Sequence, residues 1–173
     1  MNKRPSGEIL FDVALVSDTH VNEKEDFSTS PYPANGEANP RARYVFQQIN
    51  QGNAQFCIHL GDMVNPVPEL PSYVEAANNF HQLAAELKMP LHLMPGNHDI
   101  GDKPVTWMPA GMVNSEHISL YRKHFGSDYF SFNHENCHFV IINSPLINSG
   151  DPAEKEQADW LEADLESNKG KRI

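Results

Sequence analysis

The chain has 173 residues, of which 39% are hydrophobic and 21% charged, and these values suit a single domain with one core. The formal net charge is −10 and no Lys/Arg cluster occurs, which argues against a nucleic-acid backbone as the partner. No run of about 18 apolar residues is present, so we expect neither a membrane span nor a membrane partner.

The first half of the chain alternates predicted strands with predicted helices. Short apolar runs indicate strands, and apolar residues at i, i+3, i+4 and i+7 indicate helices. The strands are expected at residues 9–17, 54–60 and 91–94, with helices starting near 40 and 73 between them. This β-α-β-α-β order predicts parallel strands with right-handed crossovers.

Side chains that cap helices are predicted at three places. Asn39 is expected to be the N-cap of the first helix. Ser72 with Glu75, and Asp151 with Glu154, have the spacing of a capping box. These residues predict where the helices begin.

The second half of the chain has a different pattern. Residues 100–114 lack periodicity, carry Trp107 and Met108, and fit a lid or a plain connector equally well. Apolar runs on both sides of a polar turn predict a hairpin after a short helix. The expected elements are a helix over 115–125, a hairpin over 129–142, a helix over 152–166 and a new strand beginning at 172.

The two cysteines, Cys57 and Cys137, both lie in apolar runs typical of strands. Buried thiols are therefore favoured over a disulfide. A cleaved signal peptide would remove the first motif described below, so none is expected. These observations predict a cytoplasmic location.

Polar motifs follow each of the first three predicted strands. They are Ser17-Asp18-Thr19-His20, Gly61-Asp62 and Gly96-Asn97-His98-Asp99. In open α/β sheets, ligands bind at the carboxyl ends of the strands. Carboxylate, imidazole and carboxamide groups without a thiolate suit hard or borderline divalent metals. The residues therefore predict a metal-dependent hydrolase.

These three motifs, in this order, resemble those of the calcineurin-like metallophosphoesterases. The likeness extends to the hairpin and the helix that follows it. It implies an α/β fold of the αββα sandwich type with mixed sheets, formed by one domain over residues 1–173. The family has a further histidine and a Gly-His-x-His motif downstream, which this chain lacks. We therefore expect a domain truncated at its C-terminus.

The same resemblance implies a site with two divalent ions, for which Mn, Fe and Zn are all compatible. The implied metal ligands are Asp18, His20, Asp62 and Asn97. Asp62 would bridge the two ions. His98 would donate a proton to the leaving oxygen or clamp the phosphate, with Asp99 orienting it. A metal-activated hydroxide would then attack the phosphorus.

Two details qualify this site. Purple acid phosphatases resemble the family but have a tyrosine three residues after the bridging Asp, where this chain has Asn65, so a tyrosinate–Fe(III) site is not expected. Without the downstream histidines, the second ion keeps only Asp62 and Asn97, too few ligands for tight binding. The first ion keeps Asp18, His20 and Asp62, so we expect two ions in the complete protein and one or none in this chain alone. Among the other histidines, His138 is the best candidate for a substitute ligand. His59 and His92 are expected to be packed, and His117 and His124 to be exposed.

The resemblance implies hydrolysis of phosphate mono- or diesters by the complete protein. Its substrate would be a phosphorylated small molecule or a phosphoprotein. A cyclic-nucleotide phosphodiesterase is an alternative, because that branch has the same Asp-x-His opening. A non-catalytic binding module is another, because the downstream histidines are missing. The retained motif residues favour the enzyme.

Overall fold

The computed structural model describes residues 7–28, 30–104 and 110–173. Trp107 and Met108, and with them the middle of the proposed lid, lie outside the described residues. The elements of the first half are β1 (Val13–Val16), η1 (Pro33–Glu37), α1 (Ala38–Ile49), β2 (Phe56–His59), α2 (Tyr73–Ala84), β3 (Leu91–Leu93) and α3 (Asn97–Ile100). Those of the second half are α4 (Ser115–Phe125), β4 (Phe130–His134), β5 (Cys137–Ile141), η2 (Ser144–Leu146) and α5 (Pro152–Ser167).

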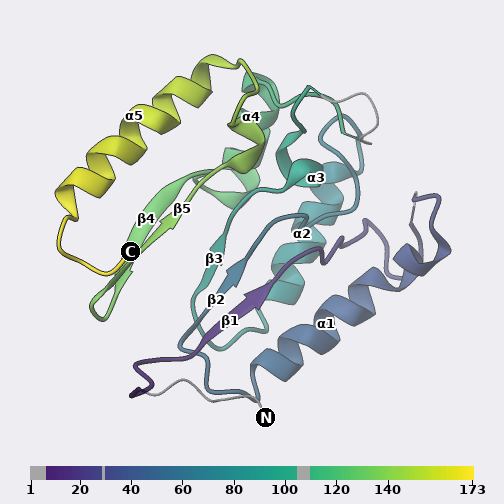
Figure 1. Cartoon of the computed structure of the whole chain (residues 1–173). Coiled ribbons are helices and arrows are strands. Elements are labelled where there is room, and N and C mark those ends of the chain that lie inside the picture. Colours follow the sequence, from purple (N-terminus) through teal and green to yellow (C-terminus); the bar gives the residue numbers. More distant parts are fainter. Residues whose placement is uncertain (1–6, 29, 105–109) are drawn as a thin grey trace, which may run out of the picture.

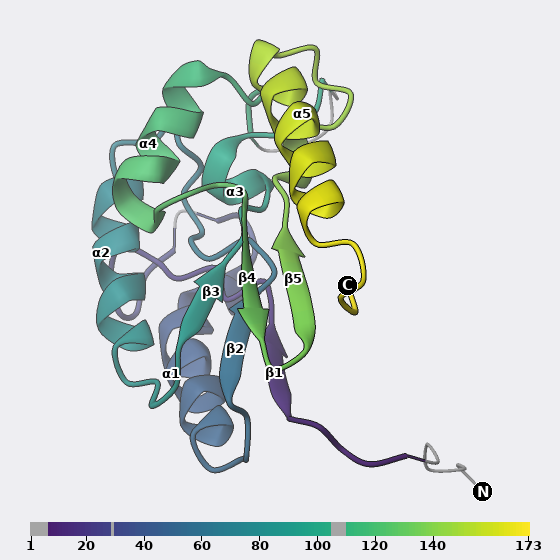
Figure 2. The same ribbon diagram turned by 90° about the vertical axis from the view of Figure 1, so that its left-hand side faces the viewer.

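The elements form four layers (Figures 1 and 2). Helices α1, α2 and α4 cover one face of the sheet β1-β2-β3. The hairpin β4-β5 packs on the other face of that sheet, and α5 covers the hairpin from outside. The expected αββα order is therefore confirmed.

The strands β1, β2 and β3 are parallel, as predicted, and lie in the order of the sequence. Their carboxyl ends, and the three polar motifs, therefore meet at one edge of the sheet. The second sheet pairs β4 with β5 in antiparallel fashion. Arg172 forms an isolated parallel bridge to Cys137 beside this sheet, so the strand predicted from residue 172 is represented by that one bridge.

Two apolar clusters separate the layers. The first lies between the parallel sheet and the helices, and Phe46 of α1 and Phe80 of α2 meet there edge to face. The second lies between the two sheets and is mostly aromatic. In it, Phe56 of β2 contacts Phe132 and Phe139 of the hairpin at centroid distances of 5.4 and 5.1 Å. Such pairs add stability beyond the area that they bury.

The predicted caps are only partly correct. Asn39 is not the N-cap, because α1 already begins at Ala38 and Asn39 lies inside its first turn. The buried Asn39 side chain accepts the N–H of Asn22 at 2.7 Å instead. Ser72 makes no cap bond, because its backbone is already helical at φ −74°, ψ −8°. Asp151 caps α5 by accepting the N–H of Ala153 at 2.9 Å, as expected, but Glu154 accepts the N–H groups of Asn148 and Gly150 instead of completing the capping box.

Two histidine predictions also differ from the structure. His117 is buried rather than exposed, because its side of α4 packs against the segment that contains Gly101. His138 is hydrogen-bonded to Asp164 at 2.6 Å and to Asn133 at 3.0 Å. These bonds tie the hairpin to α5, so His138 does not serve as the substitute metal ligand.

Both cysteines are free and buried, as predicted, Cys57 in β2 and Cys137 in β5. Among the helices of the described residues, none combines the length and the hydropathy that crossing a membrane requires.

Candidate metal centre

The loops after β1 and β2 lie side by side and are held together by backbone hydrogen bonds. The N–H of Asp18 donates to the carbonyl of Gly61, and the N–H of His20 donates to the carbonyl of Asp62, both at 3.0 Å. The parallel pairing of the two strands thus continues into the loops. It places the first two motifs next to each other.

Three of the expected ligands have an unusual backbone conformation. Asp18, His20 and Asp62 have φ values of 55°, 44° and 57°, in the left-handed region that residues other than glycine rarely adopt. Such strain persists only where the surroundings impose it, and it clusters at functional sites. The conformation therefore marks these three positions independently of the motif.

Glycines allow the second and third motifs to approach closely. A Cβ atom on Gly96 would collide with the side chain of Asp62 and would lie 2.5 Å from its backbone nitrogen. A Cβ on Gly61 would lie 2.5 Å from the nitrogen of Gly96, and Gly61 also has φ +104°. Both glycines are therefore required where the two loops touch.

The donor atoms around His20 are spaced like metal ligands. Its Nε2 lies 3.7 Å from Oδ1 of Asp18 and 3.8 Å from Oδ2 of Asp62. These distances are too long for hydrogen bonds. They are close to the separation of about 3.4 Å between ligands in a tetrahedral site with bonds of about 2.1 Å. The donor set therefore fits a divalent ion.

The ionisation of His20 agrees with this interpretation. Burial, and next the neighbouring His98, lower the pKa of His20, while Asp62 and Asp18 oppose the shift. The imidazole is therefore neutral near pH 7, and the neutral ring is the form that binds metals.

His20, Asp62 and His98 each offer an atom within 4.8 Å of the others.

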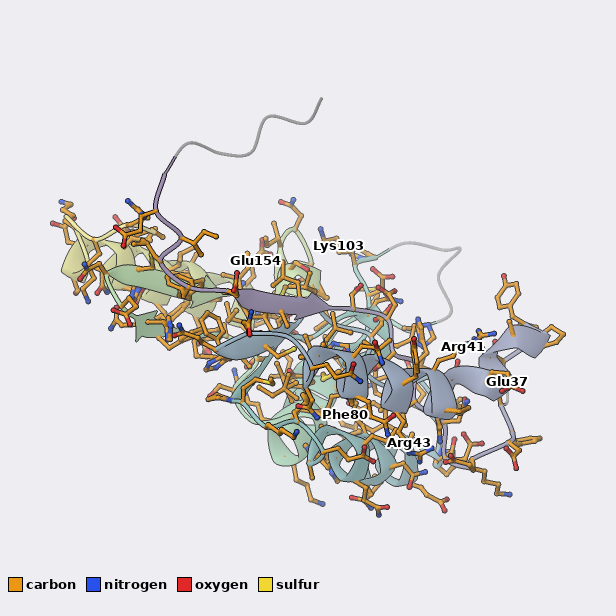
Figure 3. The ribbon with its side chains drawn as sticks, turned by 90° about the horizontal axis from the view of Figure 1, so that it is seen from below. Glu37, Arg41, Arg43, Phe80, Lys103 and Glu154 are labelled. Atoms are coloured by element: carbon orange, nitrogen blue, oxygen red, sulfur yellow. The ribbon has the colours of Figure 1, made fainter. Side chains whose placement is uncertain are left out.

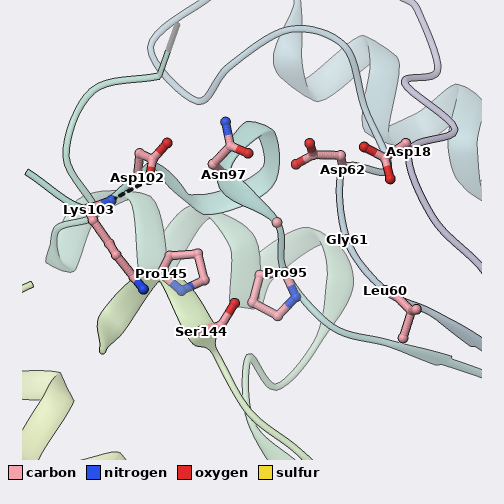
Figure 4. Close-up of a pocket in the computed structure, with 11 residues that line it drawn as sticks. Asp18, Leu60, Gly61, Asp62, Pro95, Asn97, Asp102, Lys103, Ser144 and Pro145 are labelled. Atoms are coloured by element: carbon pink, nitrogen blue, oxygen red, sulfur yellow. Dashed lines mark hydrogen bonds between the residues drawn. The ribbon is translucent and has the colours of Figure 1, made fainter. Parts of the chain in front are cut away.

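Asn97 lies in the same cavity as the carboxylates (Figure 4). The cavity has a volume of about 340 Å³. It is lined by Asp18, Leu60, Gly61, Asp62, Pro95, Gly96, Asn97, Asp102, Lys103, Ser144 and Pro145. The amide oxygen of Asn97 is on the side of Asp62, and its Nδ2 is buried without a partner among the described residues. An oxygen ligand is thus available beside Asp62.

Lys103 contributes the cationic group of this cavity. It is half-buried and forms no ion pair with any residue that the structure describes. Arg41 and Arg43 extend instead from α1 (Figure 3). Arg43 is paired with Glu25 at 2.7 Å, and Arg41 donates to the carbonyl of Ala34 at 3.2 Å. Hydrogen bonds from the N–H groups of Asn148 and Gly150, and more weakly the charge of Lys103, lower the pKa of Glu154. The ammonium of Lys103 thus acts on that carboxylate while also lining the cavity, where it can attract an anion.

Two hydrogen bonds hold His98 in place, one from its backbone N–H and one from its ring. Its N–H donates to Oδ1 of Asp62 at 3.0 Å, and its Nδ1 lies 2.6 Å from the carbonyl oxygen of Asn65. A carbonyl only accepts, so Nδ1 carries the hydrogen. Nε2 is then left for the site, where the ring stands edge-on to His20 with 4.6 Å between centroids.

The predicted contact of Asp99 with His98 is wrong. The carboxylate of Asp99 is buried and accepts the N–H groups of Asp62 at 2.7 Å and of Met63 and Gly96 at 2.9 Å. The side chains of successive helical residues point about 100° apart around the helix axis, so the side chain of Asp99 points inward when that of His98 points to the site. Burial and Asp62 raise the pKa of Asp99 to about 8, whereas the N–H donors lower it.

Comparison with known proteins agrees with this geometry. The chain matches the calcineurin-like phosphoesterase family over residues 11–170. It belongs to that family. The resemblance inferred from the motifs is thereby confirmed.

Curated relatives of this calcineurin-like chain include serine/threonine-protein phosphatase CPPED1. The Bos taurus protein is 30% identical over 131 residues, which are 72% of this chain and 39% of CPPED1. The Homo sapiens protein is 29% identical over 126 residues, which are 69% of this chain and 37% of CPPED1. The chain thus spans less than two fifths of the length of these relatives.

A solved structure shares the fold. Purple acid phosphatase PPD1 from yellow lupin (Lupinus luteus) seeds has a TM-score of 0.55 and 18% sequence identity. The match covers 90% of this chain and 27% of PPD1. At this identity the likeness concerns the fold alone, and it agrees with the four layers seen here.

The calcineurin-like motifs account for most of the site, but three groups were missed by sequence reasoning. They are the ammonium of Lys103, the hydroxyl of Ser144 and the backbone carbonyl of Asn65. Ser144 follows β5, so the rule that ligands bind at strand ends could have found it. No sequence pattern marks Lys103 or a backbone carbonyl.

Proposed function

We propose that this chain carries the metal-binding part of a phosphoesterase that hydrolyses phosphate mono- or diesters. The observation that carries the proposal is the pair of distances, 3.7 and 3.8 Å, from His20 to the carboxylates of Asp18 and Asp62. The three residues hold strained backbones at the edge where ligands bind in such sheets. The phosphatase names of the relatives support the same reaction class.

These residues would take part in a site for two divalent ions in the complete protein. Asp18 and His20 would hold one ion, Asp62 would bridge both, and Asn97 would hold the other through its amide oxygen. Oxygen and imidazole ligands are compatible with Mn, Fe or Zn. When bound, such ions supply charge that polarises the phosphoryl oxygens and acidifies a water molecule.

The remaining polar groups have roles that follow from their contacts. His98 can carry a proton on Nε2 and release it to the leaving oxygen, because Asn65 keeps the other hydrogen on Nδ1. The ammonium of Lys103 would attract an anionic phosphoester into a protein whose net charge is −10. Asp99 would keep the loop of Asp62 in place through its hydrogen bonds to backbone N–H groups.

The proposed substrate is a phosphorylated small molecule or a phosphoprotein. The relatives' name, serine/threonine-protein phosphatase, favours the phosphoprotein. The free thiols of Cys57 and Cys137 support a reducing compartment, and we propose a cytoplasmic location.

A binding module with a single ion is the second candidate. It is favoured by the compact group of His20, Asp62 and His98, since these three together could hold one ion. In that case His98 would be a ligand and would not be available as an acid.

Metal stoichiometry and hydrolysis together test the proposal. The chain is loaded with manganese, desalted and analysed for metal, and its activity is measured on a phosphoserine peptide and on cyclic AMP. Two ions with hydrolysis of the peptide support the phosphoesterase. Hydrolysis of cyclic AMP alone would assign a cyclic-nucleotide phosphodiesterase. One ion whose binding is lost in His98→Asn supports the binding module, because His98 is then a ligand, and absence of any bound ion contradicts both.

The matched variants are Asp62→Asn and Asp159→Asn. Asp62→Asn removes the charge between the expected ion positions and should abolish metal binding. Asp159 is an exposed carboxylate of α5 that pairs with Lys155, so its substitution should leave metal binding unchanged. Equal metal content in both variants would contradict the role of Asp62.

A further inference from the structure

A continuous chain of hydrogen bonds lies behind the candidate ligands. Thr19 stands between Asp18 and His20, and its hydroxyl is 2.9 Å from Nε2 of His59 and 3.0 Å from the carbonyl oxygen of Met63. Nδ1 of His59 accepts the N–H of Gly61 at 3.3 Å. The chain therefore joins the end of β2 to both metal-binding loops.

The direction of each hydrogen bond in this chain is determined by its end groups. The carbonyl of Met63 only accepts, so the hydroxyl of Thr19 donates to it and must accept from Nε2 of His59. The N–H of Gly61 only donates, so Nδ1 of His59 has no hydrogen. Both ends require the same neutral tautomer, with the hydrogen on Nε2.

The surroundings of His59 agree with a neutral ring. Its side chain is fully buried and packs edge-on against Phe80 with 5.5 Å between centroids. Burial lowers the pKa of His59 to about 4. A second hydrogen, on Nδ1, would point at the N–H of Gly61, so a cationic ring would break the chain.

We propose that His59 and Thr19 are positioning residues that hold the Asp18–His20 loop and the Asp62 loop at the separation needed to bind a metal ion. Thr19 is flanked on both sides by residues with positive φ, and Gly61 and Met63 flank Asp62, which has positive φ as well. The chain of hydrogen bonds thus acts on the neighbours of all three strained ligands. Neither His59 nor Thr19 is among the expected metal ligands. The inference takes one point from the proposed function, namely that Asp18, His20 and Asp62 bind metal.

The first test compares two substitutions of Thr19. Thr19→Val removes the hydroxyl and keeps the side-chain shape, whereas Thr19→Ser keeps the hydroxyl. Loss of a group that orients metal ligands typically lowers metal affinity by about 10- to 100-fold. We expect Thr19→Val to raise the Kd for Mn²⁺ by that factor and Thr19→Ser to leave it within about threefold. Equal Kd values for the two folded variants would overturn the proposal.

His59 is tested with a matched histidine on the next strand. His59→Phe should raise the Kd for Mn²⁺ as Thr19→Val does, and His59→Gln should restore part of the affinity, because its amide can donate to Thr19. His92 of β3 stacks on Phe132 with 3.7 Å between centroids, on the hairpin side of the sheet. His92→Gln should leave the affinity unchanged. Equal losses in the His59 and His92 variants would also overturn the proposal.

A spectroscopic readout separates this proposal from the proposed function. In the metal-free protein labelled with ¹⁵N-histidine, NMR should show the hydrogen of His59 on Nε2 at pH 7. The backbone amide signals of Asp18, His20 and Asp62 should shift in Thr19→Val but not in Thr19→Ser. If the chain binds no Mn²⁺, the proposed function fails, but the NMR signals still test whether His59 and Thr19 position the two loops. That positioning role would be overturned by a hydrogen on Nδ1 of His59, or by unshifted amide signals in Thr19→Val.

Discussion

The carbonyl oxygen of Asn65 lies 2.6 Å from Nδ1 of His98 and so determines which ring nitrogen of His98 faces the site. This relationship replaces the expected pairing of His98 with Asp99. It connects the loop after β2 to the helix after β3 through a backbone group. Substituting the side chain of Asn65 would not remove it.

His98 should be needed for hydrolysis and not for metal binding. A positioned general acid typically contributes about 10²- to 10⁴-fold to the rate, so we expect His98→Asn to lower kcat by that factor. The Kd for Mn²⁺, measured by titration, should stay within about threefold of the unsubstituted value. A tenfold or larger rise in Kd would make His98 a ligand, as in the single-ion binding module.

Gly96 should tolerate no side chain. Gly96→Ala places a Cβ 2.5 Å from the nitrogen of Asp62, and overpacking of this kind costs about 1–3 kcal/mol. We expect a lower free energy of unfolding in urea and a loss of Mn²⁺ binding. Gly36→Ala is the control, because nothing lies within 4 Å of its Cβ. If the two variants have the same free energy of unfolding and the same Mn²⁺ binding, the two loops do not approach each other as closely as described.

Lys103 should affect substrate binding more than turnover. A hydrogen bond to a charged group contributes about 1.5–3 kcal/mol, so Lys103→Met should raise KM for a phosphomonoester roughly tenfold or more. The control is Lys155→Met, which removes an exposed lysine of α5 paired with Asp159. Unchanged KM in Lys103→Met would show that its ammonium does not contact the phosphate.

Acid should destabilise the fold through His59. Its pKa is about 4 in the folded protein and about 6.5 when unfolded, so the unfolded state binds the proton first. The corresponding stability is complete above pH 6.5 and is lost as the pH falls toward 4, by about 3 kcal/mol in total. The free energy of unfolding in urea should therefore fall more between pH 7 and pH 5 in the unsubstituted protein than in His59→Phe. Parallel losses in the two proteins would contradict a buried neutral His59.

The element order and the position of the site could be predicted because they depend on local patterns. The apolar runs before Asp18, Asp62 and Asn97 predicted three strands whose motifs meet at one sheet edge, as the structure shows. The hairpin and the helix from Pro152 were also predicted, because their turn and cap signals are close in sequence. These features require only short-range chemistry.

The caps and the histidine environments were less predictable. Asn39 has the composition of an N-cap, but a residue 17 positions earlier, Asn22, supplies its hydrogen-bond partner. His117 lies on a helix that looks amphipathic with this residue outside, yet the segment near Gly101 covers it. In both cases a contact from a distant part of the chain overrides the local preference.

The sequence by itself determined the residue types of the site, their order and the sheet edge at which they gather, since parallel strands place their carboxyl ends together. Only the tertiary structure decided how these residues are held. Asp99 turns to backbone N–H groups, Asn65 supplies the carbonyl for His98, and His59 joins both loops through Thr19. Hydrogen bonds between residues some 30 to 40 positions apart depend on the packing of whole layers, which no local pattern records.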